Sequence, residues 1–503
     1  MARPWSSTLT TALAGPLAAA AGLAVGHLLA ALTSPATSPV LVVGSTVIDR
    51  TPTPVKEWAI ARFGTDDKAF LVGSVLAVVL LAAVGAGLLA RRRPVHGAAA
   101  LATLACVAAV LALLRPAAGP AAVLPSLAAA VVAAGVLLQL TRLPATARDG
   151  SARRAVLLGM GMVALGAAGV GEAGRRTIAR RQRSETVALP APTEPAGPFP
   201  AGLDRVVPGI TPLRTPTREF YRVDTRLDVP VIDSAGWTLR VDGDVRRPFT
   251  LTFDDLLAMP LIERDITLTC VSNSVGGPYA GGARWLGVRL TELLDRAGVG
   301  DRADQILSTD VAAMTISTPL ALAADGRDAM VAVGMNGAPL PREHGFPARL
   351  LVPGLYGFIS ATKWLTRLTL TTYADQSAYW TDRGWATDAP IKIASRIDIP
   401  RPLARLDVGE VVIGGVAWAQ GAGGVARVEV SIDGGAWQPA RLGPTAGDAY
   451  WRQWFLRWNA GPGPHTLSTR VVDAQGHAQT PVRANPFPAG ASGLHTIDVT
   501  VGS

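Results

Sequence analysis

The stretch ITLTCVSNSVGG, residues 266–277, decides how this chain is interpreted. Its first four residues continue a pattern of alternating apolar and polar positions, which is typical of a half-buried strand. Ser, Asn and Gly follow, and such a cluster predicts a loop. Cys270 therefore lies where a strand ends and a loop begins. The chain contains two cysteines, and the other, Cys106, lies in an apolar run far away.

Three roles are open to the Cys270 thiol at this point: inert packing, a nucleophile and a metal ligand. Free cysteines are often simply buried. A nucleophile needs an adjacent base, and His344 is the one histidine of residues 204–400. A zinc site is a poor fit, because structural zinc takes four Cys or His ligands and catalytic zinc usually takes three protein ligands.

The chain divides into an apolar half and a polar half. Its mean hydropathy is +0.30, and charged residues make up 17% of the 503 residues. The apolar surplus lies in residues 1–175. A membrane span needs about 20 mainly apolar residues, and five stretches qualify: residues 8–32, 69–90, 97–114, 120–140 and 155–173. Residues 1–175 are therefore predicted to be a five-span membrane α-helical bundle that contacts lipid.

Arginine clusters predict the topology of these spans. RRR (91–93) and TRLPATARDGSARR (141–154) lie in alternate loops, which the positive-inside rule places in the cytoplasm. Everything after the fifth span is then extracytoplasmic. Arg153 and Arg154 also precede a moderately apolar, Gly/Ala-rich segment, which resembles a twin-arginine export signal. Because much of the net charge of +9 is arginine beside apolar segments, it does not indicate nucleic-acid binding.

The polar half is predicted to contain a linker and two domains. Residues 176–203 are a Pro/Ala-rich linker. Residues 204–399 mix strand and helix patterns without a βαβ period, which favours an α+β domain. Residues 400–503 contain regularly spaced strand-like runs with Gly-rich turns, which is typical of an Ig-like β-sandwich. Trp451, Trp454 and Trp458 are expected to be sandwich core and edge residues.

Further stretches carry a family resemblance. EFYRVDT (219–225), PREHGFPARLLVPGLYG (341–357) and ISATKWLTRLTL (359–370) occur in order around TLTC. Together these stretches look like the sulfite oxidase family of molybdenum enzymes over about residues 210–500. A single cysteine is sufficient in that family, because the dithiolene of a molybdopterin cofactor supplies the other sulfur ligands. A soft thiolate suits such a centre.

The resemblance assigns roles to eight residues. It implies that Cys270 is the molybdenum ligand. It also implies that Cys270, Arg222 and Trp285 are the catalytic residues at the reacting centre. It implies that the molybdopterin is bound by Phe220, Arg222, Asn273, His344, Arg349 and Lys363, with Lys363 on the phosphate. It also implies that residues 400–503 resemble a dimerisation domain, so that a homodimer is possible.

Departures from the family pattern bear on the substrate. Sulfite-oxidising members have arginines soon after the cysteine, whereas residues 271–276 here are uncharged. Asp224 replaces a family histidine, and YWTDRGW (379–385) has no clear match to a family tyrosine. These differences disfavour sulfite and leave the substrate open, with reduction of a sulfoxide-type oxide as the alternative chemistry. The small-molecule substrate is then an oxygen-atom donor or acceptor.

Electron exchange requires a partner, because the sequence has no haem-attachment motif or iron–sulfur cysteine set. An external cytochrome or a quinone-linked membrane protein is expected. Two other functions remain open on the residues: a non-catalytic membrane-anchored scaffold with a degenerate cofactor domain, and a Cys-His hydrolase.

Overall fold

The computed structural model describes residues 5–52, 55, 58, 59, 62, 63, 67–142, 150–182 and 187–502. The chain divides into two compact units. The first, here called the helical unit, is Met1–Arg183 with Asp224–Val231, and the second is Ser184–Val223 with Ile232–Ser503. The chain therefore enters the second unit, returns to the helical unit for residues 224–231, and enters the second unit again.

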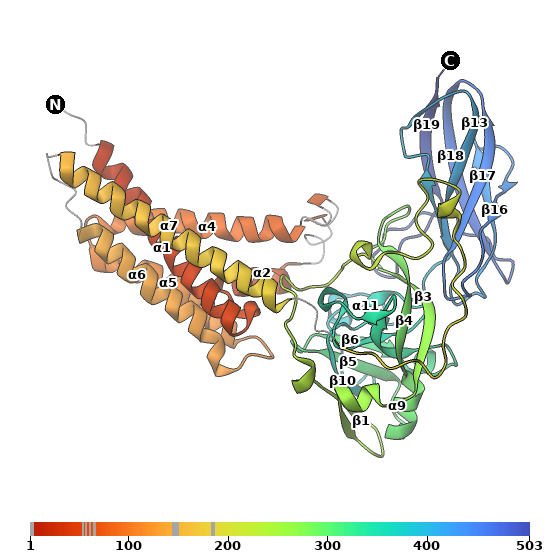
Figure 1. Cartoon of the computed structure of the whole chain (residues 1–503), viewed down its shortest axis with the longest axis horizontal. Coiled ribbons are helices and arrows are strands. Elements are labelled where there is room, and N and C mark those ends of the chain that lie inside the picture. The colour runs from red at the N-terminus through yellow and green to blue at the C-terminus, as the bar shows by residue number, and fades with distance from the viewer. Residues whose placement is uncertain are drawn as a thin grey trace. The chain divides into compact units, whose positions relative to one another are not determined.

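The helical unit contains long apolar helices (Figure 1). They pack closely through small residues. A Cβ atom added at Gly15 would lie 1.8 Å from the Ala83 carbonyl oxygen, and one at Gly22 would lie 2.5 Å from that of Ala129. Such small residues let helix backbones approach closely, as in membrane proteins. The helices are α1 (Trp5–Leu32), α2 (Pro39–Arg50), α4 (Asp67–Ala90), α5 (Pro94–Leu113), α6 (Leu124–Arg142) and α7 (Gly150–Arg181).

Five of the described helical stretches are long and apolar enough to cross a membrane, which confirms the five predicted apolar helices. They are Ala12–Leu32, Lys68–Ala90, Pro94–Leu113, Pro120–Arg142 and Leu157–Arg181. The last helix runs to Arg181 rather than ending near residue 173, because the basic stretch that follows is rich in Arg, which favours helix. Arg153 and Arg154 lie in α7, but their side chains are outside the described residues.

The first domain of the second unit is built on two sheets. One has the strand order β2-β1-β10-β5-β6, and the other has the order β3-β4-β7-β8 with β9 paired to β7. The strands are β1 (Thr238–Gly243), β2 (Phe249–Thr252), β3 (Leu261–Thr269), β4 (Ala280–Arg289), β5 (Gln305–Asp310), β6 (Thr315–Pro319), β7 (Met330–Met335), β8 (Ala338–Pro339), β9 (Arg349–Leu351) and β10 (Leu365–Thr371). Short helices connect them: α8 (Phe253–Leu257), α9 (Leu290–Ala297), α10 (Leu320–Ala323) and α11 (Gly357–Ser360).

Local sequence explains several of these elements. Helix α8 begins at a capping box, in which the Thr252 hydroxyl accepts from the Asp255 backbone N–H and the Asp255 carboxylate accepts from the Thr252 N–H. Helix α9 ends at Gly298, whose φ of 64° is easily adopted only by glycine. Strand β3 ends at Thr269, so that Cys270 follows directly, as the sequence predicts.

The C-terminal strands form two further sheets that fit a β-sandwich (Figure 1). Their orders are β11-β13-β17-β16 and β12-β19-β18-β14-β15. The strands are β11 (Ala394–Ile399), β12 (Arg405–Leu406), β13 (Gly409–Trp418), β14 (Val425–Ile432), β15 (Gln438–Pro439), β16 (Arg441–Leu442), β17 (Arg452–Ala460), β18 (Gly463–Asp473) and β19 (His495–Val501). A hairpin turn at Asp433, with φ of 55°, leads from β14 to β15.

The predicted tryptophan cluster has two environments. Trp454 is fully buried in the sandwich core, and Trp458 packs against that core while half-buried. Trp451 instead belongs to the core of the preceding domain, where its Nε1 donates to the Leu213 carbonyl at 2.7 Å. Trp451 therefore joins the two domains of the second unit.

The Pro-rich stretch at 187–203 is extended, and it packs on the second unit. The Thr193 N–H donates to the Leu261 carbonyl at 2.8 Å. The Glu194 carboxylate pairs with Arg264 at 2.7 Å and Arg289 at 2.6 Å. The Phe199 ring lies 4.0 Å from the Arg214 guanidinium. These contacts make residues 187–203 a strap on the domain surface.

We predict that Trp451→Ala destabilises the protein by about 3–5 kcal/mol, because it removes a fully buried aromatic ring and leaves a cavity. The Leu213 carbonyl also loses one of its two hydrogen bonds and keeps the one from the Tyr450 hydroxyl. Thermal unfolding of the purified chain measures the effect. The half-buried Trp458→Ala is the matched control and should cost clearly less, and equal losses for the two variants would contradict this account.

Candidate active site

A closed loop holds the Cys270 thiol. The Cys270 N–H donates to the Tyr279 carbonyl at 2.9 Å, and the Asn273 N–H donates to the Cys270 carbonyl at 3.0 Å. The Asn273 side-chain oxygen accepts from the Tyr279 N–H at 2.8 Å. Asn273 is therefore part of the loop's own hydrogen-bond network. Gly276, with φ of 77°, packs so closely on the His495 imidazole that an added Cβ would lie 2.2 Å from it.

The electrostatic setting of Cys270 has opposing contributions. Burial raises the pKa of the thiol, while hydrogen bonds at Ser272 and the nearby Lys363 cation oppose the rise. A buried thiol needs a strong positive partner to become a thiolate. A metal ion provides such a partner, because it deprotonates a coordinating thiol outright.

Phe220, Trp285, His344 and Arg349 come together beside this loop. The Phe220 ring packs edge-to-face on Trp285 with centroids 5.8 Å apart and on His344 with centroids 5.5 Å apart. The Arg349 guanidinium lies 5.2 Å from the Trp285 ring centroid. The Trp285 Nε1 donates to the Ile266 carbonyl at 3.2 Å, which ties this group to strand β3. Residues far apart in sequence thus form one packed cluster.

The His344 imidazole is held neutral. Burial, then the Arg349, Lys363 and Arg222 cations, lowers the pKa of His344 to about 4, although a bond to the Thr217 carbonyl opposes this. His344 Nε2 lies 3.2 Å from that carbonyl oxygen, which can only accept. The neutral ring therefore carries its proton on Nε2.

The cationic residues of the cluster fit an anionic ligand. Burial lowers the pKa of Arg349 to about 10. Its Nη1 donates to the His344 carbonyl at 3.0 Å, whereas its buried Nε has no hydrogen-bond partner among the described residues. The Lys363 Nζ lies 4.6 Å from the Trp364 ring centroid and donates to the Glu343 carbonyl at 3.2 Å. A buried guanidinium and a half-buried ammonium suit a phosphate or a heterocycle edge.

A glycine allows the two cation-bearing segments to meet. Gly345 has φ of 111°, and an added Cβ would lie 3.1 Å from both Arg349 and Lys363. Only glycine adopts this backbone region without strain. The His-Gly-Phe-Pro-x-Arg spacing therefore has a packing reason in this fold.

Two tyrosines at the site were not among the predicted residues. Burial and the neighbouring Cys270 raise the pKa of Tyr221 above its usual range. Burial also raises the pKa of Tyr356 to about 12, with a smaller contribution from Cys270. Both phenols therefore stay protonated and can donate a hydrogen bond near the thiol. Tyr221 lies between Phe220 and Arg222 in the sequence, which was the one available signal for it.

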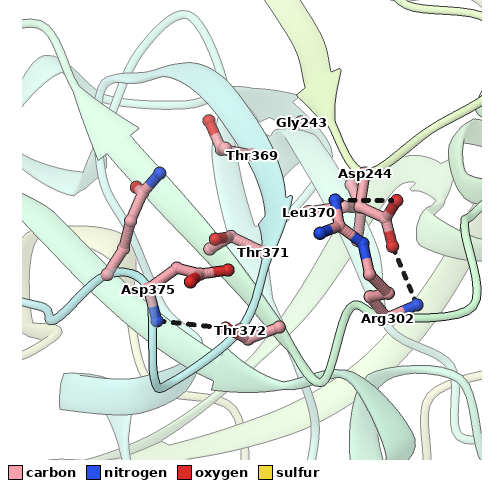
Figure 2. Close-up of a pocket in the computed structure, with 9 residues that line it drawn as sticks. Gly243, Asp244, Arg302, Thr369, Leu370, Thr371, Thr372 and Asp375 are labelled. Atoms are coloured by element: carbon pink, nitrogen blue, oxygen red, sulfur yellow. Dashed lines mark hydrogen bonds and ion pairs between the residues drawn. The ribbon is translucent and has the colours of Figure 1, made fainter.

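Two hollows lie near these elements. A small one of about 20 Å³ adjoins the Cys270 loop and is lined by Thr269, Asn273 and Tyr356 among others. A larger one of about 210 Å³ is polar, with Asp244 and Arg302 at one side and Asp375 at the other (Figure 2). It lies where β10 ends, whereas Lys363 precedes the start of β10, so the larger hollow is separate from the Cys270 cluster.

Comparison with known proteins shows which proteins this chain resembles. The family model for the oxidoreductase molybdopterin binding domain matches residues 226–380. Mitochondrial sulfite oxidase of Rattus norvegicus is 33% identical over 270 residues, which cover 45% of this chain and 49% of that protein. The sulfane dehydrogenase SoxCD of Paracoccus pantotrophus has a similar structure, with a TM-score of 0.51 and 26% identity, covering 57% of this chain and 81% of that one.

Residues 226–380 carry the oxidoreductase molybdopterin binding domain, and the wider chain is similar to the sulfite oxidase family. A nitrate reductase (NAD(P)H) of Hordeum vulgare is also similar, with 28% identity over 51% of this chain and 34% of that protein. The chain spans about half the length of the curated sulfite oxidases it matches. The cofactor is molybdopterin, and the chain is an oxidoreductase, which confirms both predictions. The scaffold and hydrolase alternatives are set aside.

The described residues fit this cofactor. No group of three or more His, Cys, Asp or Glu side chains among them could hold a metal ion. A molybdenum ion held here by the Cys270 thiol would therefore need its other ligands from the cofactor. The unpartnered Nε of buried Arg349 matches the anionic and hydrogen-bonding character of a pterin with its phosphate.

We predict that the stability of the protein falls as the pH is lowered from about 6.5 toward 4. The unfolded chain binds a proton on His344 near 6.5, but the folded chain binds it only near 4. This contribution is present above pH 6.5 and is worth up to about 3 kcal/mol. The free energy of unfolding, measured at several pH values, should depend less on pH in His344→Gln than in the unmodified chain.

His465 provides a control, because its pKa is shifted in the opposite direction to that of His344. The Asp433 carboxylate raises the pKa of this half-buried histidine. Its contribution to the free energy of unfolding is present at low pH and is lost as the pH rises through the pKa of the folded state. His465→Gln should therefore make the loss of stability at low pH slightly steeper. A His344→Gln variant with an unchanged pH profile would contradict the proposed burial effect.

Proposed function

We propose that the chain is a membrane-anchored, extracytoplasmic molybdenum oxidoreductase that performs two-electron oxygen-atom transfer. The observation that carries this proposal is the buried Cys270 thiol at the end of β3, in a site that also holds the buried Arg349 guanidinium and the half-buried Lys363 ammonium. When bound, the cofactor supplies a metal that accepts or donates two electrons and an oxygen atom. The chain supplies position and electrostatics.

Each site residue has a proposed task. Cys270 ligates molybdenum. Arg222 and Trp285 lie beside the reacting centre, where Arg222 would orient a polar substrate and Trp285 would exclude water. The molybdopterin is bound by Phe220, Arg222, Asn273, His344, Arg349 and Lys363. Asn273 acts chiefly by shaping the Cys270 loop, since its side-chain oxygen is already bonded to the Tyr279 N–H.

The proposed substrate is a neutral oxide of the sulfoxide type. Residues 271–276, which follow the metal ligand, carry no charge that would bind a sulfite dianion. Reduction of a sulfoxide consumes two electrons and two protons and yields a thioether and water. Asp224 is not part of this argument, because its carboxylate is paired with Lys68 at 3.0 Å. Its charge is therefore neutralised locally.

The electrons are proposed to come from an external cytochrome or a quinone-linked membrane protein. The C-terminal sandwich is proposed to be Ig-like and to form a homodimer contact. The five apolar helices are proposed to span the membrane with lipid around them and with the RRR loop (91–93) in the cytoplasm. The domains are proposed as residues 1–175, 176–203, 204–399 and 400–503.

We predict that Cys270→Ser abolishes the substrate-dependent molybdenum EPR signal and lowers activity more than about 100-fold, because even outer partners of metal ligands cost up to that much. Cys106→Ser, at an exposed position in α5, is the matched control and should behave as the unmodified chain. The assay uses protein from a cofactor-competent host and a panel of sulfite, sulfoxides and N-oxides. An unaltered spectrum in Cys270→Ser would refute the ligand assignment, and a response to sulfite alone would refute the substrate.

We predict that Arg153→Lys with Arg154→Lys leaves residues 187–502 on the cytoplasmic side. A domain loaded with cofactor in the cytoplasm must cross the membrane folded, and the twin-arginine route carries folded proteins. Protease added from outside should then fail to digest the domain. The control is Arg91→Lys with Arg92→Lys, which keeps the charge of another loop. Normal digestion in the Arg153/Arg154 variant would argue against this route.

A further inference from the structure

The C-terminal sandwich contacts the loop that begins at the proposed metal ligand. This loop, here called the Cys270 loop, is residues 270–279 between β3 and β4. Two side chains of the sandwich reach its second half, Arg396 from β11 and His495 from β19. Strands β11 and β19 belong to different sheets, so both sheets of the sandwich take part in the contact.

The Arg396 guanidinium bonds to three acceptors at once. Its Nη1 donates to the Gly277 carbonyl of the Cys270 loop at 2.9 Å. Its Nε donates to the Asp398 carboxylate at 2.7 Å, and its Nη2 donates to the Thr211 hydroxyl at 2.8 Å. The Arg396 side chain is 11% exposed. Because the donors of a guanidinium form a rigid, planar fork, the three contacts together fix the place of the Gly277 carbonyl.

The His495 imidazole packs against the neighbouring glycine. Its Nδ1 accepts from the Ile397 N–H at 2.9 Å, which fixes the ring on β11. A Cβ atom added at Gly276 would lie 2.2 Å from Nε2 and 2.3 Å from Cδ2 of this ring. The ring therefore occupies the space that a side chain at position 276 would need, and it prevents the loop from moving toward the sandwich.

Hydrogen bonds lead from these contacts back to Cys270. The Gly277 N–H donates to the Ser274 carbonyl at 2.8 Å, and the Asn273 N–H donates to the Cys270 carbonyl at 3.0 Å. A Cβ added at Gly277 would lie 2.6 Å from the Asn273 side-chain oxygen that closes the loop. A displacement of Gly277 would therefore disturb the bonds that shape the backbone at Cys270.

We propose that Arg396 and His495 are positioning residues, which keep the Cys270 thiol in place by holding Gly276 and Gly277. This inference rests on the proposed function. A metal ligand has to be held within about 0.5 Å of its working position by supporting contacts. The β3–β4 hairpin directs Cys270 at one end of the loop, and the sandwich holds the other end. The sandwich thereby contributes to the site, in addition to its proposed dimer contact.

The test uses two substitutions in the full-length chain in lipid nanodiscs. Arg396→Lys keeps a cation beside Asp398, but an ammonium on a flexible stem cannot reproduce the three-way fork. His495→Asn keeps a side-chain oxygen that can accept from the Ile397 N–H, but it removes the ring edge against Gly276. Thermal unfolding shows that each variant is folded.

The matched control is Arg452→Lys. Arg452 also donates to two backbone carbonyls, those of Gly443 at 3.0 Å and Val425 at 3.2 Å. Both acceptors lie within the sandwich, and neither belongs to the Cys270 loop. The control therefore measures what the loss of a guanidinium fork does to the sandwich alone.

Two kinds of measurement report the position of Cys270. The thiol is buried, so in protein from a host that makes no molybdopterin, its rate of alkylation by iodoacetamide reports local opening of the loop. Peptide mass spectrometry assigns the alkylation to Cys270. In protein from a cofactor-competent host, the molybdenum EPR line shape and the separate values of kcat and KM report the site.

Arg396→Lys should raise the alkylation rate of Cys270 about tenfold, because the Gly277 carbonyl loses a hydrogen bond from a charged donor. His495→Asn should raise the rate less, since it removes a packing contact and no hydrogen bond to the loop. Both variants should broaden the EPR line and lower kcat more than they raise KM. Arg452→Lys should match the unmodified chain in every measurement.

An unchanged alkylation rate in both variants would overturn the proposed contact. An equal rise in Arg452→Lys would overturn its assignment to Arg396 and His495. Faster alkylation with an unaltered EPR line and kcat would overturn the link from the loop to the metal ligand. If Arg396→Lys does not fold, His495→Asn decides by the same criteria.

The failure of this proposal and the failure of the proposed function are distinguishable. An unmodified chain that contains no molybdenum when made in a cofactor-competent host would refute the proposed function. The alkylation rates, which are measured without the cofactor, would still decide whether Arg396 and His495 hold the Cys270 loop.

Discussion

The pairing of β3 with β4 is the constraint on which the site depends. The two strands are in register from Leu261 opposite Val288 to Thr269 opposite Ala280. The next residue is Cys270, and its loop is closed by one backbone hydrogen bond, from Cys270 to Tyr279, and by the Asn273 side chain. A lone thiol can serve a metal only if its direction is fixed, since no second protein ligand corrects it. The hairpin provides that direction.

The rigid arrangement of the site has a cost in free energy, because it holds cations close to His344. Burying the Arg349 guanidinium with an unpartnered Nε is unfavourable for the protein alone. The aromatic rings of Phe220 and Trp285 and the Gly345 backbone hold these groups in place nonetheless. Strain and unsatisfied polarity of this kind concentrate at functional sites. Binding an anionic cofactor offsets the cost, so that cofactor binding and local stability are linked.

Local patterns predicted the local structure well. The alternation before Cys270 predicted a strand that ends there, and β3 ends at Thr269. The capping box at Thr252 and the turn at Asp433 likewise act within a few residues. Longer-range features were missed. Trp451 was expected in the sandwich and instead packs in the neighbouring core. Nothing near Trp451 in the sequence specifies that its partner is Leu213, because that contact joins positions more than 200 residues apart.

The sequence by itself determined the apolar helices, the strand that ends at Cys270 and the order of the cofactor motifs, because periodicity and residue chemistry act along the chain. Only the tertiary structure decided which groups meet. It placed the phenols of Tyr221 and Tyr356 near the thiol, and it used the oxygen of Asn273 within the loop. It also paired Asp224 with a lysine 156 residues away. Burial and long-range charge pairing depend on how distant segments pack, and no local pattern encodes that.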